Sequence, residues 1–74
     1  MKEIRAELAA TVLEIIAEPG QAVSPGDAIL VLESMKMEIP VLAESAGVLD
    51  RFAVSSGQVV REGTVLAVLA PRSR

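Results

Sequence analysis

A lysine between two methionines is the one place in this sequence where the residue types suggest chemistry. Lys36 follows Met35 and precedes Met37 within the segment ESMKMEIPV, residues 33–41. The chain has no Cys and no His, which removes a thiol nucleophile, an imidazole base and the usual ligand sets for zinc, copper and haem. We therefore expect no self-contained enzyme, and the amine of Lys36 is the group whose role must be explained.

A tight hairpin with Met35 and Lys36 at its centre is predicted for this segment. In such a hairpin Glu33 lies opposite Glu38, and two like charges that face each other destabilise a strand pair by a few tenths of a kcal/mol. Met and Lys are also unusual in a tight turn, where Asn-Gly or Asp-Gly is common. A segment that breaks local rules at an exposed point indicates function rather than folding.

The elements that must position this lysine come from a repeat. Moving residues 4–33 along by 37 positions onto residues 41–70 gives nine identities in thirty positions. The identical pairs are Ala6/Ala43, Glu7/Glu44, Ala9/Ala46, Gly20/Gly57, Gln21/Gln58, Val23/Val60, Gly26/Gly63, Val31/Val68 and Leu32/Leu69. We expect one domain over residues 1–74 whose two halves are related by pseudo-two-fold symmetry.

The repeat also weighs against a structural reading of the methionines. On that reading Met35 and Met37 fill gaps in a core, and Lys36 is an ordinary solvated lysine. The triplet, however, lies at the junction of the two halves and has no counterpart within the repeat. A feature that only one half carries is the better candidate for function.

Strands rather than helices are predicted throughout. Residues 2–18 contain good helix formers with apolar residues near one helical face, but the matching stretch 40–54 opens with Pro40 and carries Gly47 in its middle. Both stretches must therefore be extended. With turns at the paired glycines, each half has about four short strands, which predicts an all-β flattened barrel or sandwich of two interlocked four-stranded halves.

Charge and hydropathy exclude further classes. Seven basic and ten acidic residues give a net charge of −3 without any basic cluster, so nucleic acid is not an expected partner. The longest apolar run, residues 65–70, is far shorter than the ~20 residues that cross a bilayer, and residues 1–5 are not a signal peptide. We expect a monomeric cytoplasmic domain that does not bind membranes.

With these residues in place, the chain resembles the biotinyl/lipoyl attachment domain family, and most of all a minimal biotin carboxyl carrier. In that family a flattened barrel of two four-stranded halves presents a lysine at the tip of an exposed hairpin, within a Met-Lys-Met core. The motif ESMKMEIPV matches at Lys36. The family's turn glycines are matched by Gly20, Gly26, Gly47, Gly57 and Gly63.

The resemblance implies a carrier without catalytic groups of its own. A biotin protein ligase would attach biotin to Lys36, with Glu33, Met35, Met37 and Glu38 as recognition residues. Biotin carboxylase would then carboxylate the biotin, and a carboxyltransferase would pass the carboxyl group to an acceptor. The initiator Met1 favours a free-standing subunit over a fragment of a larger carboxylase.

Two other functions are also compatible with the sequence. The first is a lipoyl carrier of a 2-oxo acid dehydrogenase or glycine cleavage complex, because lipoyl domains share the fold. Lipoyl sites usually have Asp-Lys-Ala-like surroundings, so Met35 and Met37 favour biotin over lipoate. The second is a small interaction protein whose lysine is never modified.

Overall fold

The computed structural model describes residues 1–72 and contains eight β-strands in that range. The strands are β1 (Lys2–Arg5), β2 (Ala10–Ile15), β3 (Ala22–Val23), β4 (Ala28–Ser34), β5 (Met37–Leu42), β6 (Gly47–Phe52), β7 (Val59–Val60) and β8 (Val65–Ala70). No residue in the described range is helical, so the helix that the first stretch superficially suggests does not form. The described residues accordingly include no helix that could span a membrane.

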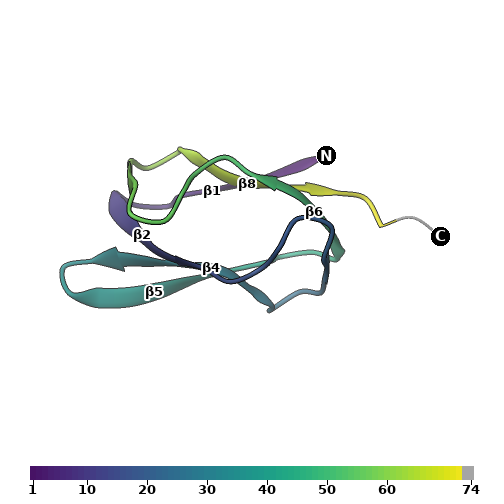
Figure 1. The fold of residues 1–74 in the computed structure, drawn as a ribbon, viewed down its shortest axis with the longest axis horizontal. Helices are drawn as coiled ribbons and strands as arrows, with labels where there is room; N and C mark the ends of the chain where they lie inside the picture. The colour runs from purple at the N-terminus through teal and green to yellow at the C-terminus, as the bar shows by residue number, and fades with distance from the viewer. Residues whose placement is uncertain (73–74) are drawn as a thin grey trace.

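The strands form two antiparallel four-stranded sheets that pack face to face (Figure 1). One sheet has the order β1-β8-β6-β3, and the other has the order β5-β4-β2-β7. Each sheet therefore takes two strands from each half of the sequence. The predicted fold class, an all-β sandwich of interlocked halves, is confirmed.

Matching elements of the two halves begin 37 residues apart. β2 and β6, β3 and β7, and β4 and β8 all show this offset. The turn glycines match in conformation as well: Gly20 and Gly57 have φ of 90° and 89°, values that L-residues rarely adopt. The pseudo-two-fold relationship thus extends from strand positions to turn geometry.

Hydrogen bonds fasten each half to the other in a reciprocal way. The Gly20 N–H donates to the Leu49 carbonyl at 2.7 Å, and the Gly57 N–H donates to the Val12 carbonyl at 2.7 Å. The Gly26 N–H donates in the same manner to the Ala43 carbonyl at 2.8 Å. Because every such turn needs a strand of the other half, neither half has all its backbone partners by itself.

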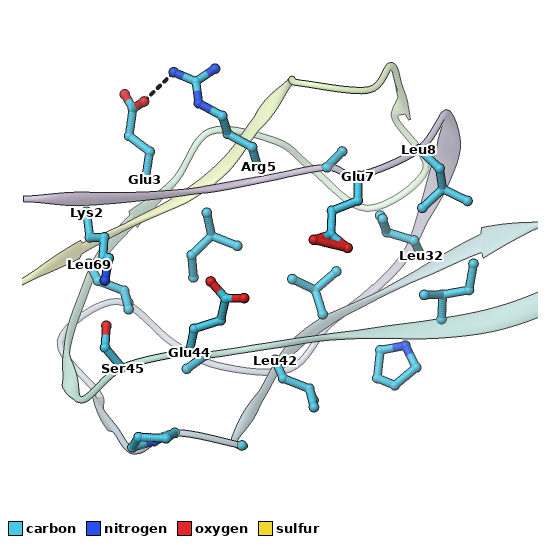
Figure 2. A pocket seen from close by; sticks show the side chains of 18 residues that line it. Lys2, Glu3, Arg5, Glu7, Leu8, Leu32, Leu42, Glu44, Ser45 and Leu69 are labelled. Carbon is cyan, nitrogen blue, oxygen red and sulfur yellow. Dashed lines mark hydrogen bonds and ion pairs between the residues drawn. The ribbon is translucent and has the colours of Figure 1, made fainter.

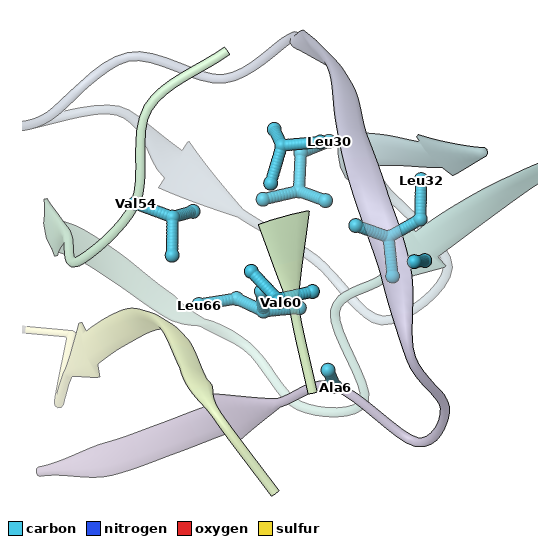
Figure 3. Packing of buried hydrophobic residues seen from close by; sticks show 8 residues of the cluster. Ala6, Leu30, Leu32, Val54, Val60 and Leu66 are labelled. Atoms are coloured by element: carbon cyan, nitrogen blue, oxygen red, sulfur yellow. The ribbon is translucent and has the colours of Figure 1, made fainter. Parts of the chain in front are cut away.

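The core between the sheets is wholly apolar over the described residues. One cluster, shown in Figure 3, is formed by Ala6, Ala10, Val12, Leu30, Leu32, Val54, Val60 and Leu66. A second cluster contains Ala17, Val23, Ile29, Ala43, Leu49, Ala67 and Leu69. Ile29 and Leu30 are adjacent in sequence yet belong to different clusters, because a register shift between Ala28 and Leu30 lets both side chains point inward.

Candidate functional site

The methionine–lysine motif forms the turn between β4 and β5. Ser34 pairs with Met37 to close the turn, and Glu33 pairs with Glu38 one step below it. This is the register that the sequence predicts. In Figure 1 the turn projects from one end of the sandwich, and the N-terminus and the end of β8 lie at the other end. The hairpin thus holds its tip clear of the rest of the chain.

Both central residues of the turn have an unfavourable backbone conformation. Met35 has φ of 53° and Lys36 has φ of 64°, and they are the only non-glycine residues in the described range with positive φ. A two-residue hairpin turn of the type I′ class requires positive φ at both positions and is normally occupied by Asn-Gly. Each L-residue in this region costs about 1 kcal/mol or more. The flanking strand pairs must therefore hold the lysine in a strained, fixed position.

The two methionines are not part of the core. The side chain of Met35 is 90% exposed and that of Met37 is 64% exposed. Lys36 is also exposed. The structural reading, in which the methionines fill gaps in the core, is wrong for both residues. They instead place apolar, adaptable surface beside the amine.

Among the described residues, no carboxylate forms an ion pair with the amine of Lys36. The ion pairs in residues 1–72 join Arg5 to Glu3 and Arg51 to Asp50. Lys36 therefore takes part in neither, although Glu33 and Glu38 lie close along the chain. Its amine is open to solvent.

The hairpin has two chemically different sides. Side chains alternate along a strand, and Leu32 points into the core, so Glu33 and its partner Glu38 point outward. Ser34 and Met37 lie on the opposite side of the hairpin, above the end of the core. A partner that approaches Lys36 meets carboxylates on one side and a methionine on the other.

This arrangement leaves the amine of Lys36 accessible to an acyl donor. Acylation of Lys36 requires that its ammonium loses a proton, and the sequence contains no His or Cys to accept it. The described residues also include no cluster of acidic side chains suited to a metal ion.

One hollow on the molecule lies away from the lysine. It is a groove of about 780 Å³ between the edge strands β1 and β5. Figure 2 shows the carboxylates of Glu7 and Glu44, one of the nine identical pairs of the repeat, pointing toward each other across it. None of residues 33–38 lines this groove. No local pattern in the sequence indicates this groove, because it forms only when the two edge strands come together.

Comparisons with known proteins identify relatives of this chain. The chain is 45% identical over 69 residues to the "Biotinylated protein TB7.3 homolog" of Mycobacterium leprae, which covers 93% of this chain and 97% of that protein. Among solved structures it is similar to part of a single-chain, multi-domain long-chain acyl-CoA carboxylase, with a TM-score of 0.88 and 39% identity, over 97% of this chain but only 7% of the carboxylase.

A lipoyl domain is also similar in structure. The lipoyl domain of the 2-oxoglutarate dehydrogenase complex from Azotobacter vinelandii matches with a TM-score of 0.77 and 27% identity, over 95% of this chain and 99% of that domain. The family model described as "Biotin-requiring enzyme" matches residues 3–69. With the all-β sandwich and its exposed lysine hairpin, this match shows that the chain belongs to the biotin/lipoyl attachment family.

Proposed function

We propose that this chain is a biotin carboxyl carrier and that biotin is attached to the amine of Lys36. The observation that carries the proposal is the strained Met35-Lys36 turn, which presents one unpaired lysine at the tip of a rigid hairpin. The similarity to a biotinylated protein over nearly the full length of both chains supports biotin as the attached group. We further propose that residues 1–74 act as one carrier domain.

Attachment is a simple acyl transfer. The neutral Nζ of Lys36 attacks the carbonyl carbon of biotinyl-adenylate, an amide bond forms, and the bond from that carbon to the phosphate oxygen breaks to release AMP. The proton leaves for a base of the biotin protein ligase, since Lys36 has no neighbouring imidazole or thiol in this chain. Met35 and Met37 offer the ligase apolar contacts, and Glu33 and Glu38 offer it charge.

The modified domain then works as a mobile substrate for two further enzymes. Biotin carboxylase adds a carboxyl group to the biotin, and a carboxyltransferase removes it to an acceptor. The chain itself supplies no catalytic group. The lysine side chain and the biotin chain together form a long arm that lets the biotin ring reach an active site. Tethering raises the effective concentration of biotin at each active site. We propose that biotinylation and carboxyl transfer take place in the cytoplasm, where ATP is available for ligation and carboxylation.

The main alternative is a lipoyl carrier with the same fold. The lipoyl domain is similar in structure but less so than the carboxylase domain, with a TM-score of 0.77 against 0.88 and an identity of 27% against 39%. Methionines on both sides of Lys36 also favour biotin. No comparable observation favours an unmodified interaction protein.

A blot with avidin tests the proposal. The wild-type chain and Lys36→Arg are each expressed with a biotin protein ligase in medium rich in biotin. We expect signal from the wild type only, because Lys2 is the only other lysine and lies in β1. A wild type without signal overturns biotinylation, and an equal signal from Lys36→Arg overturns the assignment of the site.

A further inference from the structure

The outward side of the sheet β5-β4-β2-β7 carries a row of residues just below the lysine turn. Val59 lies opposite Thr11, and Thr11 lies opposite Glu33. Glu33 in turn lies opposite Glu38. Residues that are directly opposite in antiparallel strands point to the same side of a sheet. This row therefore spans all four strands, one residue pair below the closing pair of the turn.

A second row follows further from the turn. Val12 is buried in the core, so Leu13 points outward beside Glu14 at a register shift in β2. Leu13 is 39% exposed and Val59 is 73% exposed. We call the side formed by Leu13, Glu14, Glu33, Glu38 and Val59 the acidic face.

The repeat supplies an internal comparison for this face. The other sheet has the same fold, and β2, β3 and β4 have counterparts 37 residues away in β6, β7 and β8, each in the opposite sheet. Asp50 stands at the counterpart of Leu13, and Ala22 stands at the counterpart of Val59. Arg51 corresponds to Glu14. The fold thus accepts small or polar residues at the very positions where the acidic face has exposed apolar ones.

Charge differs between the two sheets in the same way. On the outer side of β1 and β6, Arg5 pairs with Glu3 and Arg51 pairs with Asp50, and their neighbour Val68 is only 3% exposed. The acidic face has three carboxylates and, within the described residues, no Arg or Lys on the face itself. None of these carboxylates belongs to an ion pair within residues 1–72, which makes the face complementary to a basic surface.

We propose that the acidic face is the docking surface for the biotin protein ligase, with Leu13 and Val59 as its apolar anchors. This rests on the proposed function of Lys36. The complementary surface has apolar groups opposite β2 and β7 and basic side chains opposite Glu14, Glu33 and Glu38. A ligase is the occupant that fits this position, because it must bring the lysine amine itself into its active site. The enzymes that act later reach biotin at the end of a long arm and need less contact beside the turn.

The test uses the substitutions that the repeat itself suggests. The double variant Leu13→Asn/Val59→Ala removes the exposed apolar groups and leaves every carboxylate in place. The matched control is Ile16→Ala/Leu42→Gln, since Ile16 and Leu42 are each 46% exposed. Leu42 pairs with Ala28 at the far end of the sheet, about 17 Å along the strand from Glu33 at ~3.3 Å per residue. Thermal unfolding of each variant verifies that it is folded.

Steady-state biotinylation by purified ligase, ATP and biotin gives the readout. We expect kcat/KM of the anchor variant to fall about tenfold or more through a higher KM, while the control variant stays within about twofold of wild type. The proposed docking surface is overturned if kcat/KM of the anchor variant also stays within about twofold of wild type. It is equally overturned if kcat/KM of both variants falls by the same factor. A normal rate of biotinylation combined with slow carboxylation of the biotinylated variant assigns the face to the carboxylase instead. Lack of biotinylation of the wild type refutes the proposed function rather than this surface.

Salt provides a second, independent readout. Opposite charges at exposed positions attract less as ionic strength rises. The KM of the wild type is therefore expected to increase between low and high salt, and Glu14→Gln is expected to reduce that increase. An equal salt dependence for wild type and Glu14→Gln contradicts a basic partner surface over this face.

Discussion

Glu33 and Glu38 lie directly opposite each other on the outer side of the hairpin, one pair below the turn that carries Lys36. Neither carboxylate belongs to an ion pair in the described part of the chain. Both carboxylates are exposed to solvent. Their mutual repulsion opposes the pairing of β4 with β5. The hairpin keeps this arrangement directly beside the proposed attachment site, Lys36.

Removal of one of the two charges is expected to stabilise the domain slightly and to impair its modification. Glu38→Gln relieves the repulsion and raises the free energy of unfolding by about 0.3 kcal/mol. The same change weakens attraction to the ligase and raises KM for biotinylation. Urea unfolding and steady-state kinetics measure the two effects. A variant that is less stable than wild type contradicts the repulsion, and an unchanged KM contradicts a recognition role for Glu38.

Replacement of the turn residues by residues that are common in such turns is expected to stabilise the domain. Met35→Asn suits the positive φ at this position and should raise stability by about 0.5–1 kcal/mol. For a domain of this size such a gain raises Tm by roughly 2–8 °C. Scanning calorimetry measures the shift.

The rate of biotinylation separates the effect of Met35 on stability from its effect on recognition. Met35→Asn retains Lys36, so its biotinylation should be slower only because the apolar contact of Met35 is gone. Met35→Leu keeps an apolar side chain and serves as the control. If Met35→Asn is biotinylated at the wild-type rate, Met35 has no part in recognition.

Gly47 marks a place where the two halves cannot be interchanged. Its counterpart is Ala10, yet a Cβ at Gly47 would lie 2.7 Å from the backbone oxygen of Ala70. Gly47→Ala must displace β8 from β6 and is expected to lower the free energy of unfolding by about 1–3 kcal/mol, as overpacking does. Ala10→Gly, the reverse change in the other half, is the control and should cost about 1 kcal/mol. Equal stability of Gly47→Ala and wild type would show that the strands are not packed this closely.

Interlocking of the halves predicts cooperative unfolding. Leu66 is fully buried against residues of both halves in the first core cluster. Leu66→Ala should lower stability by about 2–5 kcal/mol and still unfold in one transition, because each half completes the other's backbone hydrogen bonds. Circular dichroism in urea checks both points. Two separate transitions would contradict the interlocked arrangement.

Much of the fold could be predicted from local patterns together with the repeat. The strand character of residues 2–18 followed from Pro40 and Gly47 in the matching stretch, where a helix is excluded. The register of the lysine hairpin followed from a two-residue turn, which fixes which residues face each other. The hairpin register depends only on neighbouring residues, and the strand character depends only on the 37-residue repeat.

Other features depend on contacts between distant parts of the chain. The sequence predicts that the two halves interlock, but it does not determine which strands pair, as β1 does with β8 from the opposite end of the chain. The same is true of the groove lined by Glu7 and Glu44, which requires two edge strands to meet. The acidic face, likewise, becomes evident only when Val59 and Glu33 are placed in one row across β2.

The intact mass of the purified protein tests the central claim most directly. The wild type and Lys36→Arg are produced with a biotin protein ligase, and each mass is measured before and after incubation with ATP and biotin. The carrier account predicts one biotinyl group on the wild type and none on Lys36→Arg. An unmodified wild type, a lipoyl group in place of biotin, or a biotinyl group on Lys36→Arg would contradict it.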